Sequence, residues 1–183
     1  MATKNKFISN PKTRQEIRFL QTSGDTHGEL LEMETTYQAH SLEPPHHFHP
    51  YQVEDFTVLS GQVSVRIDGQ VQILKAGDTL HSPIGKSHSM WNASDYKAVV
   101  NWKVRPALQT EFMLETITGL AIDGKTNEQG RPNLLQVALL FIKFSNEFRL
   151  ASPPVVVQRI LLNILKPIAL LLGYRDTYKK YFD

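Results

Sequence analysis

The chain has 183 residues, of which 41% are hydrophobic and 21% charged, a composition typical of a globular protein with one domain and room for an appendage. Its formal net charge of +2 is too small to indicate binding to nucleic acid. The absence of cysteine excludes disulfides and thiolate metal sites, so any metal must be held by nitrogen and oxygen ligands.

The first part of the chain has the pattern of short β-strands separated by turn residues. Strands are predicted at Gln15–Leu20, Gly28–His40, Glu54–Leu59, Gln62–Ile67, Val71–Leu74 and Lys97–Val104. Asp68-Gly69 lies between two of these runs and predicts a tight two-residue hairpin. Many short strands at even spacing favour a β-sandwich or barrel.

After Pro106 the spacing of apolar residues changes to that of helices. Helices are predicted at Thr110–Leu120, at Asn133–Leu150 with Asn133 as the N-cap, and from about residue 153 to Leu172. Gly173 is expected to end the third helix, and Pro167 is expected to kink it or to split it in two. We therefore expect a β-barrel over residues 1–106 and a helical extension over residues 107–183, packed on the barrel or on a partner subunit.

Four side chains predict a metal site in the β-rich part. His47 and His49 are two residues apart, so on a strand both imidazoles point to the same face. Glu54 follows after a short turn and supplies a carboxylate oxygen, and His88 is the fourth ligand. Three imidazoles and one carboxylate leave one or two positions open on an ion that prefers five or six ligands. Such a site binds a further molecule.

The other histidines have no such pattern. His27, His40 and His81 are expected at the surface or in ordinary hydrogen bonds, which is the usual role of a single histidine in a β-protein. Strand alternation turns His46 away from His47, so His46 is not expected to be a ligand.

The residues around the four ligands resemble the two sequence motifs of the cupin superfamily. The first motif is matched by His47, His49, Glu54 and Gly61, and the second by Gly77, Pro83, Gly85, His88 and Asn92. Ser41 stands where the first motif has its opening glycine, which leaves the local loop in question more than the site. The motif core covers residues 40–92, and the helical region lies outside it. The physical requirement behind Gly61 and Gly77 is a positive φ beside a strand, and the Pro83-Ile84-Gly85 turn is expected to present His88 to the interior.

The resemblance implies a mainly β fold, the double-stranded β-helix or jelly-roll barrel of a single-domain cupin, followed here by C-terminal α-helices. It also implies one divalent ion: Fe, Mn, Ni, Co or Zn. In some metal oxygenases of this family a glutamate at the position of Glu54 also accepts a proton from the substrate, so Glu54 is expected to act as a ligand alone or as both ligand and base.

Strand alternation predicts which side chains share the face of the metal. Phe56, Met90 and Trp102 are expected there, either as an apolar pocket for a small molecule or as plain barrel core. Tyr37 and Gln52 are further polar contacts to consider. Glu43 and Asp55 are candidates for a general base only by proximity, and both are expected to face solvent.

The C-terminal segment 155–172 has a broad apolar stripe, interrupted by Gln158, Arg159, Asn163 and Lys166. Packing against the barrel or a second subunit, and hence a homodimer, is the expectation. Association with a membrane surface is the alternative, because aromatic and basic residues at 174–182 follow the stripe. No run reaches the roughly 18 apolar residues of a membrane span, and the N-terminal segment lacks the apolar core of a signal peptide, so a cytoplasmic protein is expected.

These observations favour a metal-dependent oxygenase, similar to quercetinase-type cupins, that acts on a small organic substrate. Two alternatives remain open: a non-catalytic protein that binds or senses a small molecule at its metal, and a cupin isomerase or decarboxylase. A further alternative is a structural protein, in which the ion only stabilises the barrel.

Overall fold

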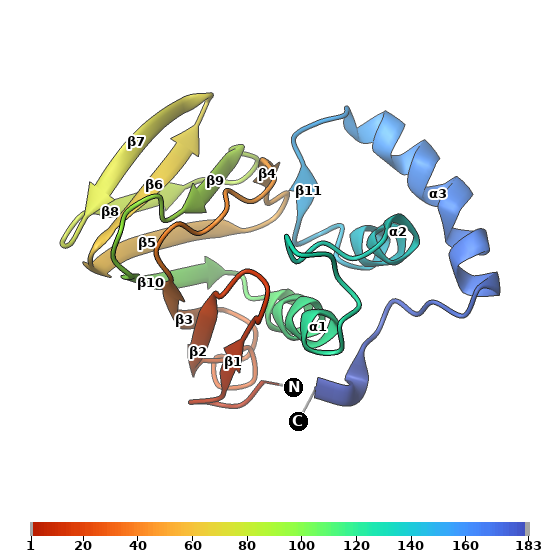
Figure 1. The fold of residues 1–183 in the computed structure, drawn as a ribbon, viewed down its shortest axis with the longest axis horizontal. Helices are drawn as coiled ribbons and strands as arrows, with labels where there is room; N and C mark the ends of the chain where they lie inside the picture. Colours follow the sequence, from red (N-terminus) through yellow and green to blue (C-terminus); the bar gives the residue numbers. More distant parts are fainter. Residues whose placement is uncertain (1, 182–183) are drawn as a thin grey trace.

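The structure is a computed structural model and describes residues 2–181. Its strands form two antiparallel sheets that pack face to face, and its helices lie together on one side of them (Figure 1). Nearly all of the strands precede Pro106, and the helices follow it. The predicted mainly β fold with C-terminal helices is confirmed.

The first sheet has the spatial order β1-β2-β3-β10-β5-β8, and the second has the order β11-β4-β9-β6-β7. The strands of the first sheet are β1 (Phe7–Ser9), β2 (Glu16–Gln21), β3 (Leu31–Tyr37), β10 (Ala98–Arg105), β5 (Val53–Ser60) and β8 (Thr79–Ser82). Those of the second sheet are β11 (Arg149–Leu150), β4 (His47–Phe48), β9 (His88–Trp91), β6 (Gln62–Ile67) and β7 (Gln70–Lys75). Strands β1, β4, β8, β9 and β11 were not predicted, because runs of two to four residues are too short to show a strand period.

Alternate residues of the central strands face the core between the sheets. In β5 the buried residues are Glu54, Phe56 and Val58, and in β10 Val100 and Val104 are fully buried. The parity predicted for Glu54 and Phe56 is therefore confirmed. Strand geometry alone carries a carboxylate into an apolar interior, where a charge without a partner costs several kcal/mol, so the residues around Glu54 must compensate for it.

Two tight turns hold the strand register. The hairpin between β6 and β7 turns at Asp68 and Gly69, with φ angles of 50° and 78°, while Ile67 pairs with Gln70. Positive φ at both central residues is the condition for a type I′ turn, as the Asp-Gly pair predicts. Gly61, between β5 and β6, has a φ of 72°, and a Cβ there would lie 2.6 Å from the carbonyl oxygen of Lys97. Only glycine fits this approach.

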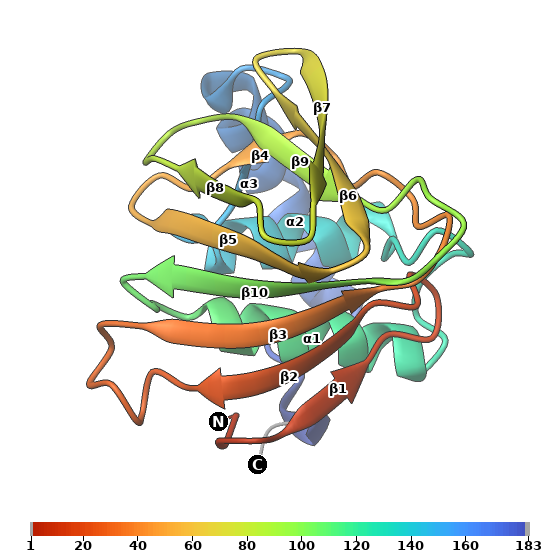
Figure 2. The ribbon, with the colours of Figure 1, turned by 90° about the vertical axis from the view of Figure 1, so that its left-hand side faces the viewer.

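Helices α1 (Thr110–Ile122) and α2 (Leu134–Lys143) lie behind the strands β2, β3 and β10 in the view of Figure 2. The side chain of Asn133 accepts a hydrogen bond from the backbone N–H of Gln136 at 3.0 Å, so the predicted N-cap of α2 is confirmed. The predicted end of this helix is wrong, because α2 ends at Lys143 rather than at Leu150. Ser145 and Asn146 favour turns over helix, and the chain after them extends into β11.

Helix α3 (Val155–Leu171) runs along α2 and is otherwise exposed (Figure 1). Pro167 lies inside it without splitting it, because the carbonyl that loses its partner belongs to Asn163, an exposed residue. Gly173 follows the helix with a φ of 84°, as predicted. Within residues 2–181, none of the helices combines the length and the apolar character that crossing a membrane requires.

The final turn η1 (Lys179–Tyr181) contacts α1. Tyr178, Lys180 and Tyr181 all bind the carboxylate of Asp123 at the end of α1, with Lys180 Nζ at 2.7 Å. These aromatic and basic groups of the tail are thus engaged with α1, whereas Phe182 lies outside the described residues.

Candidate metal centre

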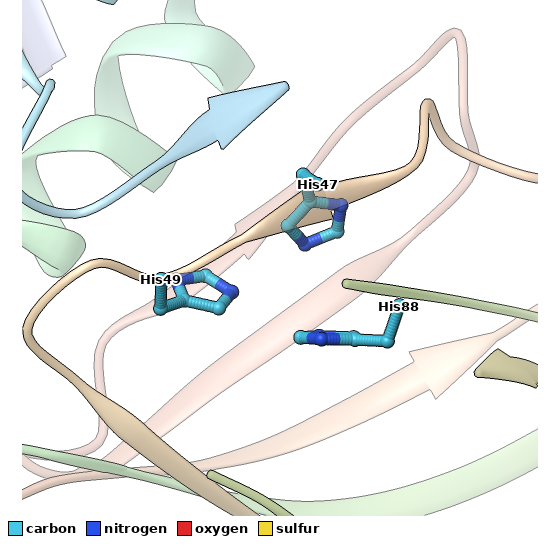
Figure 3. Close-up of side chains that lie close together, drawn as sticks. All are labelled: His47, His49 and His88. Carbon is cyan, nitrogen blue, oxygen red and sulfur yellow. The ribbon is translucent and has the colours of Figure 1, made fainter. Parts of the chain in front are cut away.

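His47 and His49 converge as their spacing predicts. His47 lies on β4 and His49 directly follows this strand, and their ring centroids are 5.2 Å apart (Figure 3). His49 is buried, with 5% of its surface exposed, and His47 is half-buried. The two imidazoles point to the same side of the chain.

His88 reaches the same point from the neighbouring strand. It opens β9, where it pairs in register with His47, and the two ring centroids lie 4.8 Å apart (Figure 3). A turn precedes it, in which the backbone N–H of Lys86 donates to the carbonyl of Pro83 at 3.1 Å. Within this turn, Gly85 donates its N–H to the carbonyl of His49 at 2.9 Å and so ties the two histidine segments together.

The three imidazoles form a cluster in which one nitrogen atom from each ring lies within 4.8 Å of the others. Each Nδ1 already has an oxygen partner. His47 Nδ1 is 2.8 Å from the carbonyl of Pro45, and His88 Nδ1 is 3.1 Å from both Ser82 Oγ and the carbonyl of Lys86. An imidazole fixed in this way keeps Nε2 free, which is the usual arrangement of a histidine that ligates a metal.

Glu54 completes the cluster from β5 in the other sheet. Its Oε2 lies 3.0 Å from His49 Nε2 and 2.9 Å from His88 Nε2, and only 1% of the residue is exposed. Its Oε1 accepts a hydrogen bond from the indole Nε1 of Trp102 at 3.0 Å. Glu54 Oε2 and His49 Nε2 are buried atoms without a hydrogen-bond partner. Such unsatisfied polar atoms are rare in a folded interior and call for an explanation.

The electrostatics of the cluster favour neutral imidazole at His47 and ionised carboxylate at Glu54. Burial, with the neighbouring His88 and His49, lowers the pKa of His47 to about 3. Burial would raise the pKa of Glu54, but the adjacent imidazoles of His49 and His88 outweigh burial and lower this pKa well below its usual range. Burial opposes a charge on His49 as well, yet the Glu54 carboxylate raises the pKa of that imidazole above its usual value. The carboxylate of Glu54 and the neutral imidazole of His47 are forms that bind metals, whereas His49 would have to release its proton when an ion binds.

The C-terminal region contributes two contacts that the sequence did not indicate. The carbonyl of Glu147 accepts a hydrogen bond from His49 Nδ1 at 2.5 Å, and the ring of Phe148 stacks on the imidazole of His47. The two following residues form β11, which pairs with β4. No local signal predicts these contacts, because about 100 residues separate the partners and one of the groups is a backbone carbonyl.

Two of the three predicted pocket residues contact the cluster: the Phe56 ring lies 6.3 Å from that of His88, and Trp102 bonds to Glu54. Phe56 and Met90 belong to the buried core, and Trp102 packs against it with its ring stacked on Phe56 at 5.9 Å between centroids. Burial and the Glu54 carboxylate raise the pKa of Tyr37 well above its usual range. Gln52 donates instead to the carbonyls of Pro106 and Ala107 and to Thr110 Oγ1, at the start of the helical region.

The remaining histidines lie outside the three-histidine cluster. His46 Nε2 is 3.5 Å from Glu43, His40 Nε2 is 3.1 Å from Asp95, and His81 Nδ1 is 2.7 Å from Asp55. The two acids considered as general bases are bound elsewhere: Glu43 pairs with Arg66 and Ser89, and Asp55 with Arg105 and His81. His27 is in a turn, with a φ of 52°.

The motif departure at Ser41 has a structural explanation. The backbone N–H of Ser41 donates to the carbonyl of Asn92, and the N–H of Asn92 donates to Ser41 Oγ, each at 2.8 Å. Ser41 thus connects the start of the first motif to the end of the second. Its φ is not positive, so the backbone at this position does not require glycine.

The sequence of this barrel matches a known protein family. A family model described as the cupin domain matches residues 33–102, which contain all of the candidate ligands. Residues 33–102 are a cupin domain. No curated protein matches the chain.

Several solved structures are similar to part of this chain. A predicted oxalate decarboxylase from Thermotoga maritima is 21% identical with a TM-score of 0.50, and the match covers 58% of this chain and 99% of that one. An RmlC-like cupin from Shewanella frigidimarina is 18% identical with a TM-score of 0.49, covering 61% and 94%. A double-stranded β-helix protein from Klebsiella pneumoniae is 18% identical with a TM-score of 0.48, covering 59% and 90%. For the Thermotoga protein, whose TM-score reaches 0.50, the likeness at 21% identity concerns the fold alone.

Proposed function

We propose that the cupin domain holds one divalent metal ion through His47, His49, Glu54 and His88. The observation that supports this most directly is the pair of buried, unpartnered atoms Glu54 Oε2 and His49 Nε2, which face each other at 3.0 Å. An ion between them would satisfy both. Three nitrogen ligands and one oxygen ligand suit Fe, Mn, Ni, Co and Zn, and availability decides among such ions.

Glu54 is proposed to act as a ligand through Oε2, with Trp102 as its positioning residue. Because the indole N–H of Trp102 holds Oε1, only Oε2 is aimed at the imidazoles. Phe56, on the same buried face of β5, and the Trp102 ring stacked on it supply apolar surface beside the carboxylate. A bound ion would supply Lewis-acid chemistry, polarising an oxygen atom of a bound molecule.

The activity that we propose is that of a metal-dependent oxygenase, quercetinase-like, acting on a small and partly apolar organic molecule. Four protein ligands leave one or two positions open on an ion that prefers five or six, and the surrounding side chains are largely apolar. An isomerase or decarboxylase would use the same site. A protein that binds its small molecule without turnover is the non-catalytic alternative.

Oxygen consumption tests the proposal. The purified protein is loaded separately with each of the five metals and assayed with flavonols, enediols and diketones. We expect metal-dependent oxygen uptake with at least one of these classes, and its loss in His88→Ala. His81→Ala is the matched control, because His81 lies outside the cluster and pairs with Asp55. No uptake with any metal and substrate class would contradict the oxygenase, and a small molecule recovered unchanged from the loaded protein would favour the binding alternative.

A further inference from the structure

A cleft lies beside the metal centre, between α2, β11 and α3, which Figure 1 shows as neighbours. It has a volume of about 250 Å³, just below the ~300–1,000 Å³ of pockets for drug-sized molecules. Phe141, Val155 and Leu162 are among its apolar lining residues, and Phe148 forms part of its wall. The cleft and the candidate metal centre therefore share one aromatic ring, because Phe148 also stacks on His47.

The cleft carries two guanidinium groups, those of Arg149 and Arg159. Arg149 uses its Nε to donate to the carbonyl of Ser145 at 2.8 Å, and within residues 2–181 it forms no ion pair. Arg159 is exposed and forms neither an ion pair nor a side-chain hydrogen bond within the same residues. Both groups keep donors available for a planar anion such as a carboxylate.

The surrounding chain supplies no carboxylate that could occupy these donors. Residues 129–175 contain six basic residues and a single acidic one, Glu147. The Glu147 side chain is buried and accepts a hydrogen bond from the backbone N–H of Gln109. The cleft is therefore apolar along its wall and positively charged at the two arginines, which is complementary to a small amphipathic anion.

We propose that this cleft binds a small amphipathic carboxylate. Its apolar chain would pack against Phe141, Phe148 and Leu162, and its carboxylate would accept hydrogen bonds from Arg149 and Arg159. The site belongs to the helical region and does not require the metal, so it can be tested separately from the proposed activity.

Hexanoate is the probe, with 1-hexanol as the matched molecule without charge. Isothermal titration should show saturable binding of hexanoate and affinity at least about tenfold weaker for hexanol, because a charge-assisted hydrogen bond is lost. Arg159→Gln should weaken hexanoate binding about tenfold, whereas Arg131→Gln, an exposed arginine outside the cleft, should not change it. His88→Ala should retain hexanoate affinity even where it loses metal. Equal binding of hexanoate and hexanol, no effect of Arg159→Gln, or no saturable binding would overturn the proposal.

A second inference rests on the outer face of α3, which no described element covers. Eight apolar side chains of α3, together with Leu172 next to it, are between 42% and 86% exposed. They are Val156, Val157, Ile160, Leu161, Ile164, Ile168, Leu170, Leu171 and Leu172. At about half exposure, the accessible surface area of these side chains is on the order of 800 Å². That equals the area that one partner buries in a standard protein–protein interface. It exceeds the ~300–600 Å² of the largest apolar patch on a typical monomer.

The spacing on this face is that of a helix pair. Val157, Leu161, Ile164, Ile168 and Leu171 are alternately four and three residues apart, which is the a/d seam of a heptad repeat. The polar residues Arg159, Asn163 and Lys166 lie on the opposite side of the helix from this seam. We infer that this seam packs against the α3 seam of a second copy of the chain, because an isologous contact pairs the same apolar surface with itself.

Sedimentation velocity tests this inference. The protein should sediment as a dimer of the 20.8 kDa chain, and Leu161→Glu combined with Ile168→Glu should yield a folded monomer. Asn163→Glu, an exposed control off the seam, should remain dimeric. A wild-type monomer at micromolar concentration would overturn the inference, as would a seam variant that stays dimeric. A monomer that co-sediments with anionic vesicles would assign the face to a membrane surface instead.

Discussion

The ring of Phe148, in the C-terminal region, lies stacked on the imidazole of His47, with centroids 4.6 Å apart and an angle of 23° between the planes. One residue earlier, the carbonyl of Glu147 accepts a hydrogen bond from His49. The helical extension therefore positions two of the proposed ligands, and changes in it should alter metal binding.

Replacing Phe148 by Ala should weaken metal binding. The stack restricts the orientation of His47, and partners that orient a ligand typically change metal affinity by about 10- to 100-fold. Affinity is measured by competition with a chelator. Phe7→Ala removes a ring that is 58% exposed on β1 and serves as the control. Equal affinities of Phe148→Ala and wild type would show that the stack does not orient the ligand.

Replacing Trp102 by Phe should lower metal affinity by about 10-fold or more, with a smaller effect on folding. The phenyl ring can keep the stack on Phe56, but the N–H that holds Glu54 Oε1 is lost. A buried acceptor without its donor also costs about 1–3 kcal/mol of stability, which thermal unfolding of the apo protein detects.

Trp91→Phe is the matched control for Trp102→Phe. Trp91 lies on β9, where the guanidinium of Arg66 is 5.6 Å from its ring centroid. If both tryptophan variants bound metal as the wild type does, Trp102 would have no positioning role.

The Glu43–Arg66 pair should make stability depend on pH in the acidic range. Hydrogen bonding by Arg66, together with Ser89, lowers the pKa of Glu43 to about 2, against ~4.3 in an unfolded chain. Because the folded pKa is the lower one, the stabilisation is complete above about pH 5 and is lost as the pH falls towards 2. Urea unfolding of the metal-free protein should show the stability advantage of wild type over Glu43→Gln shrinking across this range. An advantage that stays constant with pH would contradict the assigned pKa.

Asp123 should hold the C-terminal tail on α1. The Asp123→Ala variant removes the acceptor for Tyr178, Lys180 and Tyr181, so trypsin should cleave after the basic residues of the tail sooner than in the wild type. Mass spectrometry of timed digests locates the cleavage. Asp95→Ala, which removes an exposed acid near His40, should leave the digestion pattern unchanged. Identical digestion of wild type and Asp123→Ala would remove this role.

Much of the candidate site could be predicted because it depends on local rules. The spacing of His47 and His49 follows from strand alternation, the shared face of Glu54 and Phe56 from the same rule, and the placement of His88 from its turn. The motif resemblance joined these separate segments before the fold was known.

The remaining part of the site could not be predicted because it depends on tertiary packing. The helix predicted to reach Leu150 ends at Lys143, and the extended chain that follows brings Glu147 and Phe148 to the histidines. A backbone carbonyl leaves no trace in residue identity. The two-residue pairing of β11 with β4 is likewise too short for any periodic pattern.

The central claim is that His47, His49, Glu54 and His88 bind one divalent ion. Elemental analysis of the purified chain, repeated after chelation and reconstitution with Fe, Mn, Ni, Co or Zn, tests it most directly. We predict about one bound ion per chain in the wild type and in His81→Ala, and loss of the ion in His88→Ala and Glu54→Ala. A wild type that binds none of these ions, or variants at His88 and Glu54 that bind them as tightly as the wild type, would contradict the claim.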